Sequence, residues 1–321
     1  MTERDDHRIR TYLALGDSFS EGLMDESALE DGRFIGWADR FAHALTQSPV
    51  GSPDLLYANH AIRGRQLGAI IDEQVPVALD LKPDLVSFVA GGNDVLRPAA
   101  DVDGLAEQLE RAVSAMRAEG IEVLLGNGFD TAAFSPVLRA LRPRVAVYNA
   151  HMWTLAGRHG CYMLDLWGMR PIYAQEYWAP DRIHLSTQGH TMVAQSALGV
   201  LEEDRVGIRG FRLSKTSKPL RDRMEDEAEW LKEHLAPWVG RRLRGTSSGA
   251  YLDPKYPEWV RAAELPLEAR SQSGHHVSPA AHRAAADDAA SADTAETPGT
   301  SGDQGAPDSP GTSEAPGSSG P

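Results

Sequence analysis

Short apolar runs that alternate with helical patterns restrict the fold of this chain more than any other feature of its sequence. Five runs have the length and apolar content of strands: residues 12–15, 55–61, 85–90, 121–126 and 161–166. The third run is apolar at nearly every position, which is typical of a parallel strand with both faces covered. The pattern therefore predicts a buried sheet.

The segments between these runs have the spacing of amphipathic helices. Between the first two runs, apolar residues recur at intervals of three and four positions: Phe34, Trp37, Ala38, Phe41, Ala42 and Leu45. A second set with this spacing runs from Leu105 to Met116, and Gly120 follows it where a helix C-cap glycine is favoured. Residues 136–158 indicate a third helical region, broken near Pro143.

Strands and helices in alternation predict right-handed β-α-β units. We therefore expect one doubly wound α/β domain over residues 9–203, with a parallel sheet between two layers of helices. Ligands bind to such sheets beyond the carboxyl ends of the strands. The residues that directly follow each apolar run are thus the candidates for a functional site.

Glycines and polar residues stand at these strand ends. GDS (16–18) follows the first run, NHAIRG (59–64) closes the second, and GGND (91–94) follows the third. DRIH (181–184) comes after the fifth run, beyond a loop rich in Trp and Tyr. In a parallel sheet these segments meet at one edge, so a serine, a glycine, an asparagine, an aspartate and a histidine are expected to converge there.

Three of these residues have the chemistry of a catalytic triad. Ser18 carries a hydroxyl, which is a weak nucleophile until a neighbouring base takes its proton. His184 suits that task because an imidazole with a pKa near 6.5 can accept the proton and then pass it to the leaving group. Asp181, three residues earlier, can hold the other ring nitrogen and stabilise the imidazolium.

Acyl transfer also needs hydrogen-bond donors for the oxyanion. The backbone N–H groups of Ser18 and Gly64 and the side-chain amide of Asn93 are the candidates. A glycine fits this role because its backbone can approach a substrate closely. Taken singly, Gly64 could serve only a turn and Asn93 only a helix cap.

The four blocks, in this order, resemble the SGNH hydrolases, also called GDSL-type esterases and lipases. The resemblance rests on GDSFSEG (16–22), the glycine of NHAIRG (59–64), GGND (91–94) and DRIHLSTQGH (181–190), and it covers roughly residues 9–203. It implies a flavodoxin-like, three-layer α/β/α fold with a five-stranded parallel sheet. It also implies hydrolysis of an ester or a related acyl bond.

Other residues near these blocks each allow two interpretations. Asp17 either lines the site or caps backbone N–H groups, and the cap is favoured. His60 and Arg63 flank the candidate oxyanion glycine and contact either substrate or solvent, with solvent favoured. An aromatic loop before the DRIH block forms either a pocket wall or a cluster of its own: Trp167, Tyr173, Tyr177 and Trp178.

Competing motifs do not fit. Residues 126–128 (GNG) lack the third spaced glycine of a dinucleotide site, and no Walker lysine follows. Ser18 stands in GDSFS rather than in the GxSxG of nucleophile-elbow hydrolases. Asp94 and His190 receive no catalytic role, and the one cysteine, Cys161, excludes an intramolecular disulfide. We expect neither a metal nor a cofactor.

The chain beyond residue 203 lacks the blocks of the hydrolase. Residues 204–270 are predicted to be a helical extension, because Leu220, Met224, Ala228, Leu231 and Leu235 have helical spacing. Residues 271–321 are acidic and rich in Pro, Gly, Ser and Ala, so we predict a disordered tail. The extension either packs on the hydrolase domain or, with the tail, binds a partner.

The formal net charge of −14 and the absence of a dense basic stripe argue against nucleic acid as a partner. No run has the length of a membrane span, and the charged N-terminus does not fit a signal peptide, so a cytoplasmic protein is expected. The predicted function is a serine esterase or acylhydrolase acting on a small-molecule ester. Acyl transfer, or a non-catalytic interaction protein on a hydrolase scaffold, is the alternative. Carboxylester, thioester, acetylated sugar and lysophospholipid substrates all remain open.

Overall fold

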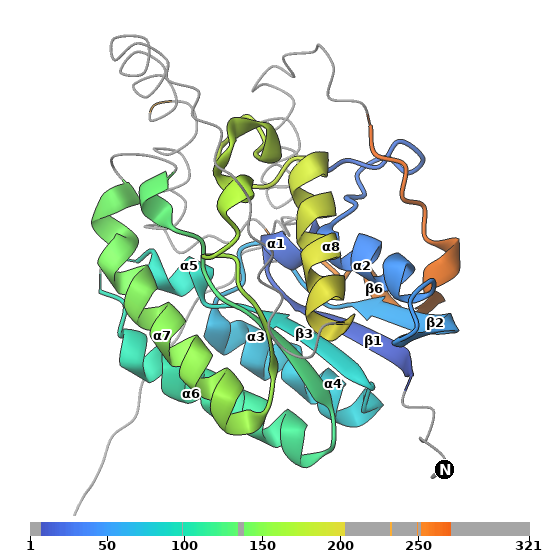
Figure 1. The fold of residues 1–321 in the computed structure, drawn as a ribbon, viewed down its shortest axis with the longest axis horizontal. Coiled ribbons are helices and arrows are strands. Elements are labelled where there is room, and N and C mark those ends of the chain that lie inside the picture. The colour runs from blue at the N-terminus through green and yellow to red at the C-terminus, as the bar shows by residue number, and fades with distance from the viewer. Residues whose placement is uncertain are drawn as a thin grey trace, which may run out of the picture. The chain divides into compact units, whose positions relative to one another are not determined.

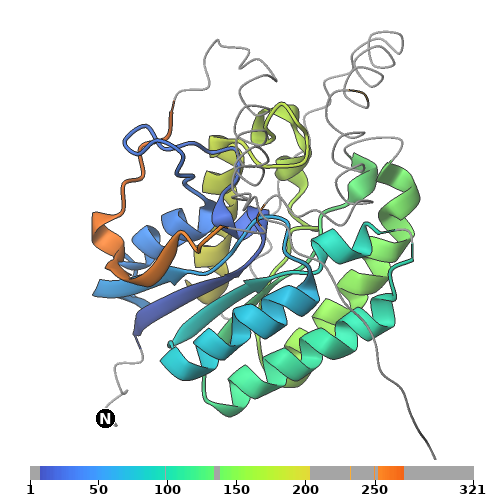
Figure 2. The same ribbon diagram turned by 180° about the vertical axis from the view of Figure 1, so that it is seen from behind.

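Six strands form one sheet in the computed structural model, which describes residues 8–97, 99–133, 138–202, 232, 249 and 252–270. In chain order they are β1 (Ile9–Gly16), β2 (Gly51–Asn59), β3 (Leu85–Val89), β4 (Glu122–Gly126), β5 (Tyr162–Leu164) and β6 (Tyr256–Arg261). Their order across the sheet is β5-β4-β3-β1-β2-β6 (Figure 1). The first five are parallel, whereas β6 runs antiparallel to β2 (Figure 2).

Each of the five apolar runs forms a strand, so the prediction of a parallel sheet is confirmed. The predicted count of five strands is wrong by one, because β6 adds to the edge of β2. The sequence of β6, YPEWVR, contains Pro257 and two charged residues and has no apolar run. An edge strand tolerates such a composition because only one side of it pairs with the sheet.

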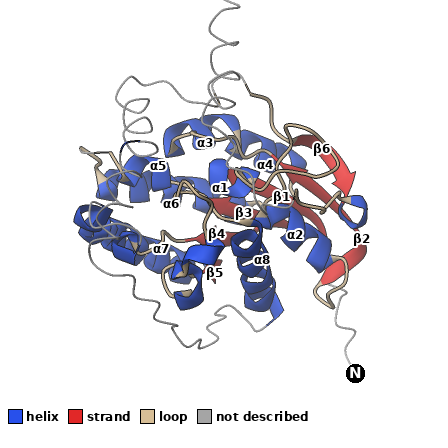
Figure 3. Cartoon of the chain, turned by 90° about the horizontal axis from the view of Figure 1, so that it is seen from above, coloured by secondary structure: helices blue, strands red, loops and turns tan. Residues whose placement is uncertain are grey.

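Helices cover both faces of the sheet (Figure 3). They are α1 (Ser18–Glu21), α2 (Trp37–Leu45), α3 (Leu67–Glu73), α4 (Val75–Leu81), α5 (Gly92–Val95), α6 (Val102–Ala118), α7 (Arg142–His159) and α8 (Thr187–Glu202). Leu13 and Leu15 of β1 pack in a core with residues of α3, α4, α6 and α7. Tyr12 and Ala14 point the other way and pack with α2 and α8. This alternation confirms the three-layer α/β/α fold.

The helix boundaries follow local capping. The helix predicted from Phe34 begins only at Trp37, because the Asp39 carboxylate accepts a hydrogen bond from the N–H of Gly36 (2.5 Å) and fixes the start. A 3₁₀ helix (Leu138–Leu141) comes directly before α7, and Pro143 lies in the first turn of α7, so the predicted helical region is divided near Pro143 as expected. Gly120 follows α6 with a φ of 81°, as the sequence predicts.

The regions beyond α8 are described only in part. Most of residues 204–251, with the helix predicted from Leu220 to Leu235, and all of the predicted tail 271–321 lie outside the described residues. The described end of the extension, residues 252–270, contains the strand β6 and pairs with the first part of the chain. There the N–H of Ala28 donates to the carbonyl of Glu268 (2.8 Å). No helix in the described ranges has the length and apolar content needed to cross a bilayer.

Candidate active site

The turn between β1 and α1 fixes Ser18 at the carboxyl end of a central strand. The Gln74 side chain binds both backbone groups of Gly16: its Oε1 accepts from the Gly16 N–H (2.8 Å) and its Nε2 donates to the Gly16 carbonyl (3.0 Å). A Cβ on Gly16 would lie 2.5 Å from the carbonyl oxygen of Val89, so β1 must end in glycine. Asp17 then caps α1, since its carboxylate accepts from the N–H of Phe19 (3.0 Å).

Ser18, His184 and Asp181 lie in one chain of hydrogen bonds. The Ser18 Oγ is 3.2 Å from His184 Nε2, and His184 Nδ1 is 2.6 Å from Asp181 Oδ2. The other oxygen of Asp181 accepts from the backbone N–H groups of Ile183 and His184, each at 3.0 Å. A proton on Nδ1 therefore faces the carboxylate and leaves Nε2 to accept the serine proton.

Asp181 has the lowered pKa expected of a carboxylate that stabilises an imidazolium. Burial acts to raise the pKa of Asp181, but the charge of His184 and the hydrogen bonds from His184 and Ile183 outweigh it. The pKa of this carboxyl consequently lies below its usual range. Asp181 is thus ionised at neutral pH.

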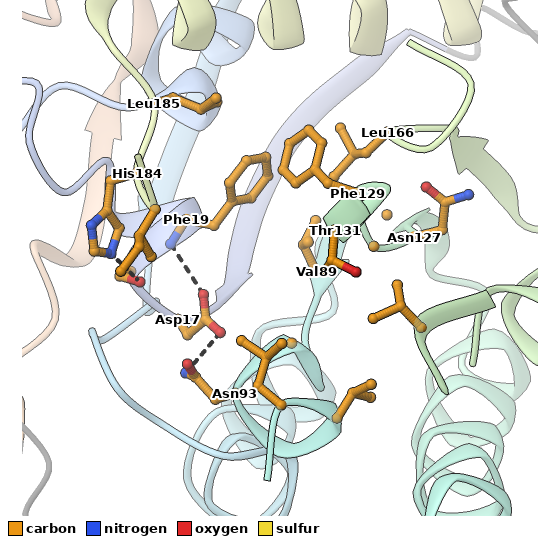
Figure 4. Close-up of a pocket in the computed structure, with 18 of the residues that line it drawn as sticks. Asp17, Phe19, Val89, Asn93, Asn127, Phe129, Thr131, Leu166, His184 and Leu185 are labelled. Atoms are coloured by element: carbon orange, nitrogen blue, oxygen red, sulfur yellow. Dashed lines mark hydrogen bonds between the residues drawn. The ribbon is translucent and has the colours of Figure 1, made fainter. Parts of the chain in front are cut away.

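The candidate oxyanion donors lie on the neighbouring strand ends. Asn93 of α5 is buried, and its Nδ2 donates to Asp17 Oδ2 (2.9 Å) and to the carbonyl of Arg65 (2.7 Å) (Figure 4). Gly64 lies in the loop after β2 with a φ of 76°, a left-handed conformation that favours glycine. Gly64 is not among the described residues that line the cavity beside Ser18.

Two other residues of this loop, His60 and Arg63, both bind other parts of the protein. The guanidinium of Arg63 forms an ion pair with Glu21, whose carboxylate also accepts from the Arg63 backbone N–H (2.8 Å). His60 is buried, and its Nε2 lies 3.1 Å from the carbonyl oxygen of Pro257. The expectation of solvent contact is therefore wrong for His60, whose partner comes from a remote part of the chain, whereas the Arg63 side chain remains 21% exposed.

Two further residues of the four sequence blocks, Asp94 and His190, have structural contacts. The carboxylate of Asp94 accepts from the N–H of Leu67 at the start of α3 (2.9 Å). His190 of α8 is buried, and its Nδ1 accepts from the N–H of Trp37 (3.1 Å). Burial lowers the pKa of His190 well below its usual range, and the cationic Arg40 and Lys255 act in the same direction. His190 is thus a neutral acceptor that joins α8 to α2.

A cavity of about 200 Å³ opens beside Ser18. Its polar lining residues include Ser18. They also include Asp17, Asn93 and His184, which Figure 4 labels. Most of the other lining side chains are apolar and come from the ends of β1, β3 and β4 and from α7 and the loop before α8: Phe19, Val89, Phe129, Val145, Leu166, Trp178, Ile183 and Leu185 among them. The arrangement places an apolar chamber next to a hydroxyl and an imidazole.

The aromatic loop divides between the two expected roles. Trp178 lines the cavity and packs edge-to-face on Phe129, with ring centroids 5.1 Å apart. Trp167 and Tyr177 are not among the described lining residues. Trp167 instead packs under the guanidinium of Arg142, 5.2 Å from its ring centroid. Tyr173 also turns inward, and its hydroxyl donates to the carbonyl of Trp167 (2.9 Å).

Sequence reasoning missed the apolar part of the site. Phe19, Val89 and Phe129 stand within three residues of the ends of β1, β3 and β4, which is where the strand-end rule directs attention. Single polar residues reveal a chemistry at these ends whereas apolar ones do not, so the sequence assigns no role in the site to these three side chains. GNGF (126–129) fails as a nucleotide motif but supplies one wall of the chamber.

Comparison with known proteins shows the family of this chain. Residues 14–192, more than half of the chain, match the model of the GDSL-like lipase/acylhydrolase family. The chain belongs to this family. The matched range includes Ser18, Gly64, Asn93, Asp181 and His184, and as a GDSL-family member the protein is a hydrolase that acts on esters. No curated protein matches the chain.

Solved structures confirm the fold of this GDSL-family member. A protein from Parabacteroides merdae described as a GDSL-like lipase is 15% identical over 62% of this chain and 98% of its own, with a TM-score of 0.52. LAE5, an α/β hydrolase enzyme from the metagenome of Lake Arreo, is 23% identical over 60% of this chain and 95% of its own, with a TM-score of 0.51. A variant of Axe2, an acetyl-xylooligosaccharide esterase from Geobacillus, is 18% identical over 64% and 100%, also with a TM-score of 0.51.

Proposed function

We propose that this ester hydrolase works through an acyl-enzyme on Ser18. The observation that carries the proposal is the pair of hydrogen bonds from Ser18 Oγ to His184 Nε2 (3.2 Å) and from His184 Nδ1 to Asp181 Oδ2 (2.6 Å). A separation of 3.2 Å is usual for such a contact before substrate binds. The two bonds couple a nucleophile, a base and the carboxylate that orients the base.

The first half-reaction forms the acyl-enzyme. Ser18 Oγ attacks the carbonyl carbon of the ester while His184 Nε2 takes the hydroxyl proton, and the carbonyl oxygen becomes an oxyanion. When the tetrahedral intermediate collapses, the bond to the alcohol oxygen breaks and His184 returns its proton to that oxygen. The ionised Asp181 stabilises the imidazolium between these two transfers.

The oxyanion is stabilised by the backbone N–H groups of Ser18 and Gly64 and by Asn93 Nδ2. Because Asn93 Nδ2 already donates to Asp17 and to the Arg65 carbonyl, donation to the oxyanion replaces one of these bonds. Until substrate binds, these two hydrogen bonds hold the Asn93 amide in its orientation. Water then attacks the acyl-enzyme by the same route, with His184 as its base, and releases the acid.

The cavity supports an apolar acyl group rather than a polar one. Its lining beyond Ser18 is mainly aliphatic and aromatic, and Phe19, Phe129 and Trp178 form a continuous aromatic wall there. A sugar hydroxyl buried against this wall would lose its hydrogen bonds to water. We therefore place the acyl chain of the ester in the chamber and the alcohol outside it.

Replacement of the nucleophile tests the proposal. Ser18→Ala should abolish hydrolysis of p-nitrophenyl acetate and butyrate and should abolish labelling by a fluorophosphonate probe. Ser20→Ala is the matched control, because Ser20 lies two residues away on the same helix and its hydroxyl is fully buried. Undiminished hydrolysis or labelling in Ser18→Ala would show that another residue carries the acyl group.

A further inference from the structure

A buried lysine from the end of the described chain binds the helix that carries Ser18. The side chain of Lys255 is only 6% exposed. Its Nζ donates to the carbonyl of Glu21 (2.7 Å), to the carbonyl of Phe34 (3.0 Å) and to Asp39 Oδ2 (2.6 Å). An ammonium group has three hydrogens, so these three oxygens satisfy it completely.

The three oxygens belong to two segments that meet beside the nucleophile. Glu21 is the last residue of α1, the helix that begins at Ser18, whereas Phe34 and Asp39 lie just before and within α2. The segments touch backbone to backbone, since a Cβ on Gly22 would lie 2.4 Å from Gly36. Lys255 thus links the end of α1 to the start of α2 at a point where the two backbones are in direct contact.

The same helix holds the loop that contains Gly64. The carboxylate of Glu21 accepts from the backbone N–H of Arg63 (2.8 Å) and from its guanidinium Nε (2.9 Å). A displacement of Glu21 would therefore move the residue that precedes Gly64. Lys255 therefore binds the backbone carbonyl of Glu21, and Arg63 binds its carboxylate.

Other contacts attach the C-terminal region to this loop. The carbonyl of Pro257, two residues after Lys255, accepts from His60 at the start of the loop (3.1 Å). Gly249 packs so closely that a Cβ there would lie 2.3 Å from the carbonyl oxygen of Arg63. The region thus contacts the nucleophile helix and the loop after β2 at separate points.

The charge of Lys255 is paired with a buried carboxylate, that of Asp39. The side chain of Asp39 is 3% exposed, and its second oxygen accepts from the hydroxyl of Tyr57 (3.0 Å). A buried charge is tolerated only when it is paired and hydrogen-bonded in this way. Lysine suits the position because its compact ammonium reaches three separate acceptors, which the planar guanidinium of arginine does not.

We propose that Lys255 is a positioning residue for the nucleophile: it holds α1, and through Glu21 the Gly64 loop, in the geometry that attack on the ester requires. The inference rests on the proposed function of Ser18 and Gly64. Lys255 lies outside residues 14–192, the range that matches the family, so these contacts are made by the extension of the chain. The positioning role makes Lys255, rather than the whole of residues 252–270, a functional part of the hydrolase.

The test compares Lys255→Met with the wild type. Loss of the ammonium leaves the Glu21 carbonyl unheld, so kcat for p-nitrophenyl acetate should fall by about 100-fold, as expected for a displacement near 1 Å, while KM changes little. The rate constant of fluorophosphonate labelling should fall in parallel, because it reports the reactivity of Ser18 alone. Arg261→Met is the matched control, since Arg261 stands on β6 in an exposed ion pair with Asp54 and should leave both rates unchanged.

The measurements are made below the unfolding transition, which circular dichroism defines. A Lys255→Met protein with a lower Tm but the wild-type kcat and labelling rate would overturn the inference, because Lys255 would then only stabilise the fold. If this variant does not fold, Asp39→Asn with Lys255→Met removes both charges and leaves neither unpaired. Failure of the double variant to fold would also overturn the inference.

The proposed function and this inference fail in different ways. A wild-type protein that neither hydrolyses the esters nor reacts with the probe would refute the role of Ser18. A wild type that does both, together with a fully active Lys255→Met, would refute only the role of Lys255.

Discussion

The carboxylate of Asp181 binds both the imidazole ring of His184 and the backbone of the turn that carries it. One carboxylate oxygen binds the imidazole at 2.6 Å, and the other accepts the N–H groups of Ile183 and His184. The first contact selects the tautomer of the ring, whereas the second pair shapes the turn. Because the two functions use different oxygens, a substitution can remove one and keep the other.

Asp181→Asn should separate them. The asparagine oxygen can still accept from the backbone, but its amide faces Nδ1 with a donor and favours the wrong tautomer. We expect kcat to fall by about 10³- to 10⁴-fold with little change in Tm. Steady-state kinetics with p-nitrophenyl acetate and a thermal melt would check this, and a loss smaller than about tenfold would contradict the assigned role.

His190 should contribute to acid sensitivity. Its folded-state pKa is lowered by burial, so in acid the unfolded chain binds a proton that the folded chain does not. The stability from the neutral form is complete above the unfolded pKa of about 6.5 and is lost as the pH falls below it toward the folded pKa. Between about pH 7.5 and 5, the Tm of the wild type should therefore drop more than that of His190→Gln.

The control for this experiment is His151→Gln, because His151 lies in an exposed pair with Asp103. This variant should follow the wild-type dependence of Tm on pH. Equal slopes for the wild type and His190→Gln would mean that other groups cause the acid sensitivity.

At the scale of elements, α7 contributes one wall of the chamber. Val145, in the first turns of α7, is nearly fully buried and lines the cavity, whereas Val147 is 48% exposed on the same helix. The two valines therefore allow a larger side chain to be introduced inside the chamber or outside it. The strand ends and this helix together bound the chamber in which we propose that the acyl chain lies.

Val145→Phe should shorten the preferred acyl chain. The larger ring occupies chamber volume, so kcat/KM for longer p-nitrophenyl esters should fall by about 10- to 200-fold relative to the acetate. Val147→Phe, the matched control, should keep the wild-type profile. A profile that Val145→Phe leaves unchanged would place the acyl group elsewhere.

Elements differ in how well the sequence predicts them. The strands β1 to β5 and the helices α2 and α6 could be predicted because their apolar periodicity is local. The strand β6 could not, because YPEWVR has no such pattern and pairs only where β2 offers an edge. The same reasoning applies to the site. The chemistry of Ser18, Asp181 and His184 could be predicted because it depends on the residue types themselves. The ion pair of Arg63 with Glu21 could not, because it joins residues 42 positions apart.

At the scale of the whole molecule, the sheet includes a strand from beyond residue 203, the predicted end of the hydrolase domain. The strand β6 covers the edge of β2, and Lys255 neutralises the buried Asp39. A chain without this segment would leave a buried carboxylate unpaired, which typically costs about 3–5 kcal/mol of stability. The tail after residue 270 is predicted to be disordered, so we expect it to contribute no comparable stability.

Two shortened chains test this difference. A chain that ends at Arg270 should keep the wild-type Tm and esterase rate, since its missing residues are predicted to be disordered. A chain that ends at Glu203 should lose most of its stability and its fluorophosphonate labelling. Full activity in the shorter chain would show that residues 14–192, the family match, suffice for the enzyme.

The contact of Lys255 with the Glu21 carbonyl spans 234 positions, so the two partners leave the ribosome far apart in time. Domains assemble from the amino end during synthesis, and the segment that contains Ser18 is among the first to emerge. Its last neighbour arrives only after most of the polypeptide has been made. If Lys255 positions α1 as proposed, a nascent chain should pair its parallel strands early but hydrolyse esters at the full rate only after residue 255 has left the ribosome.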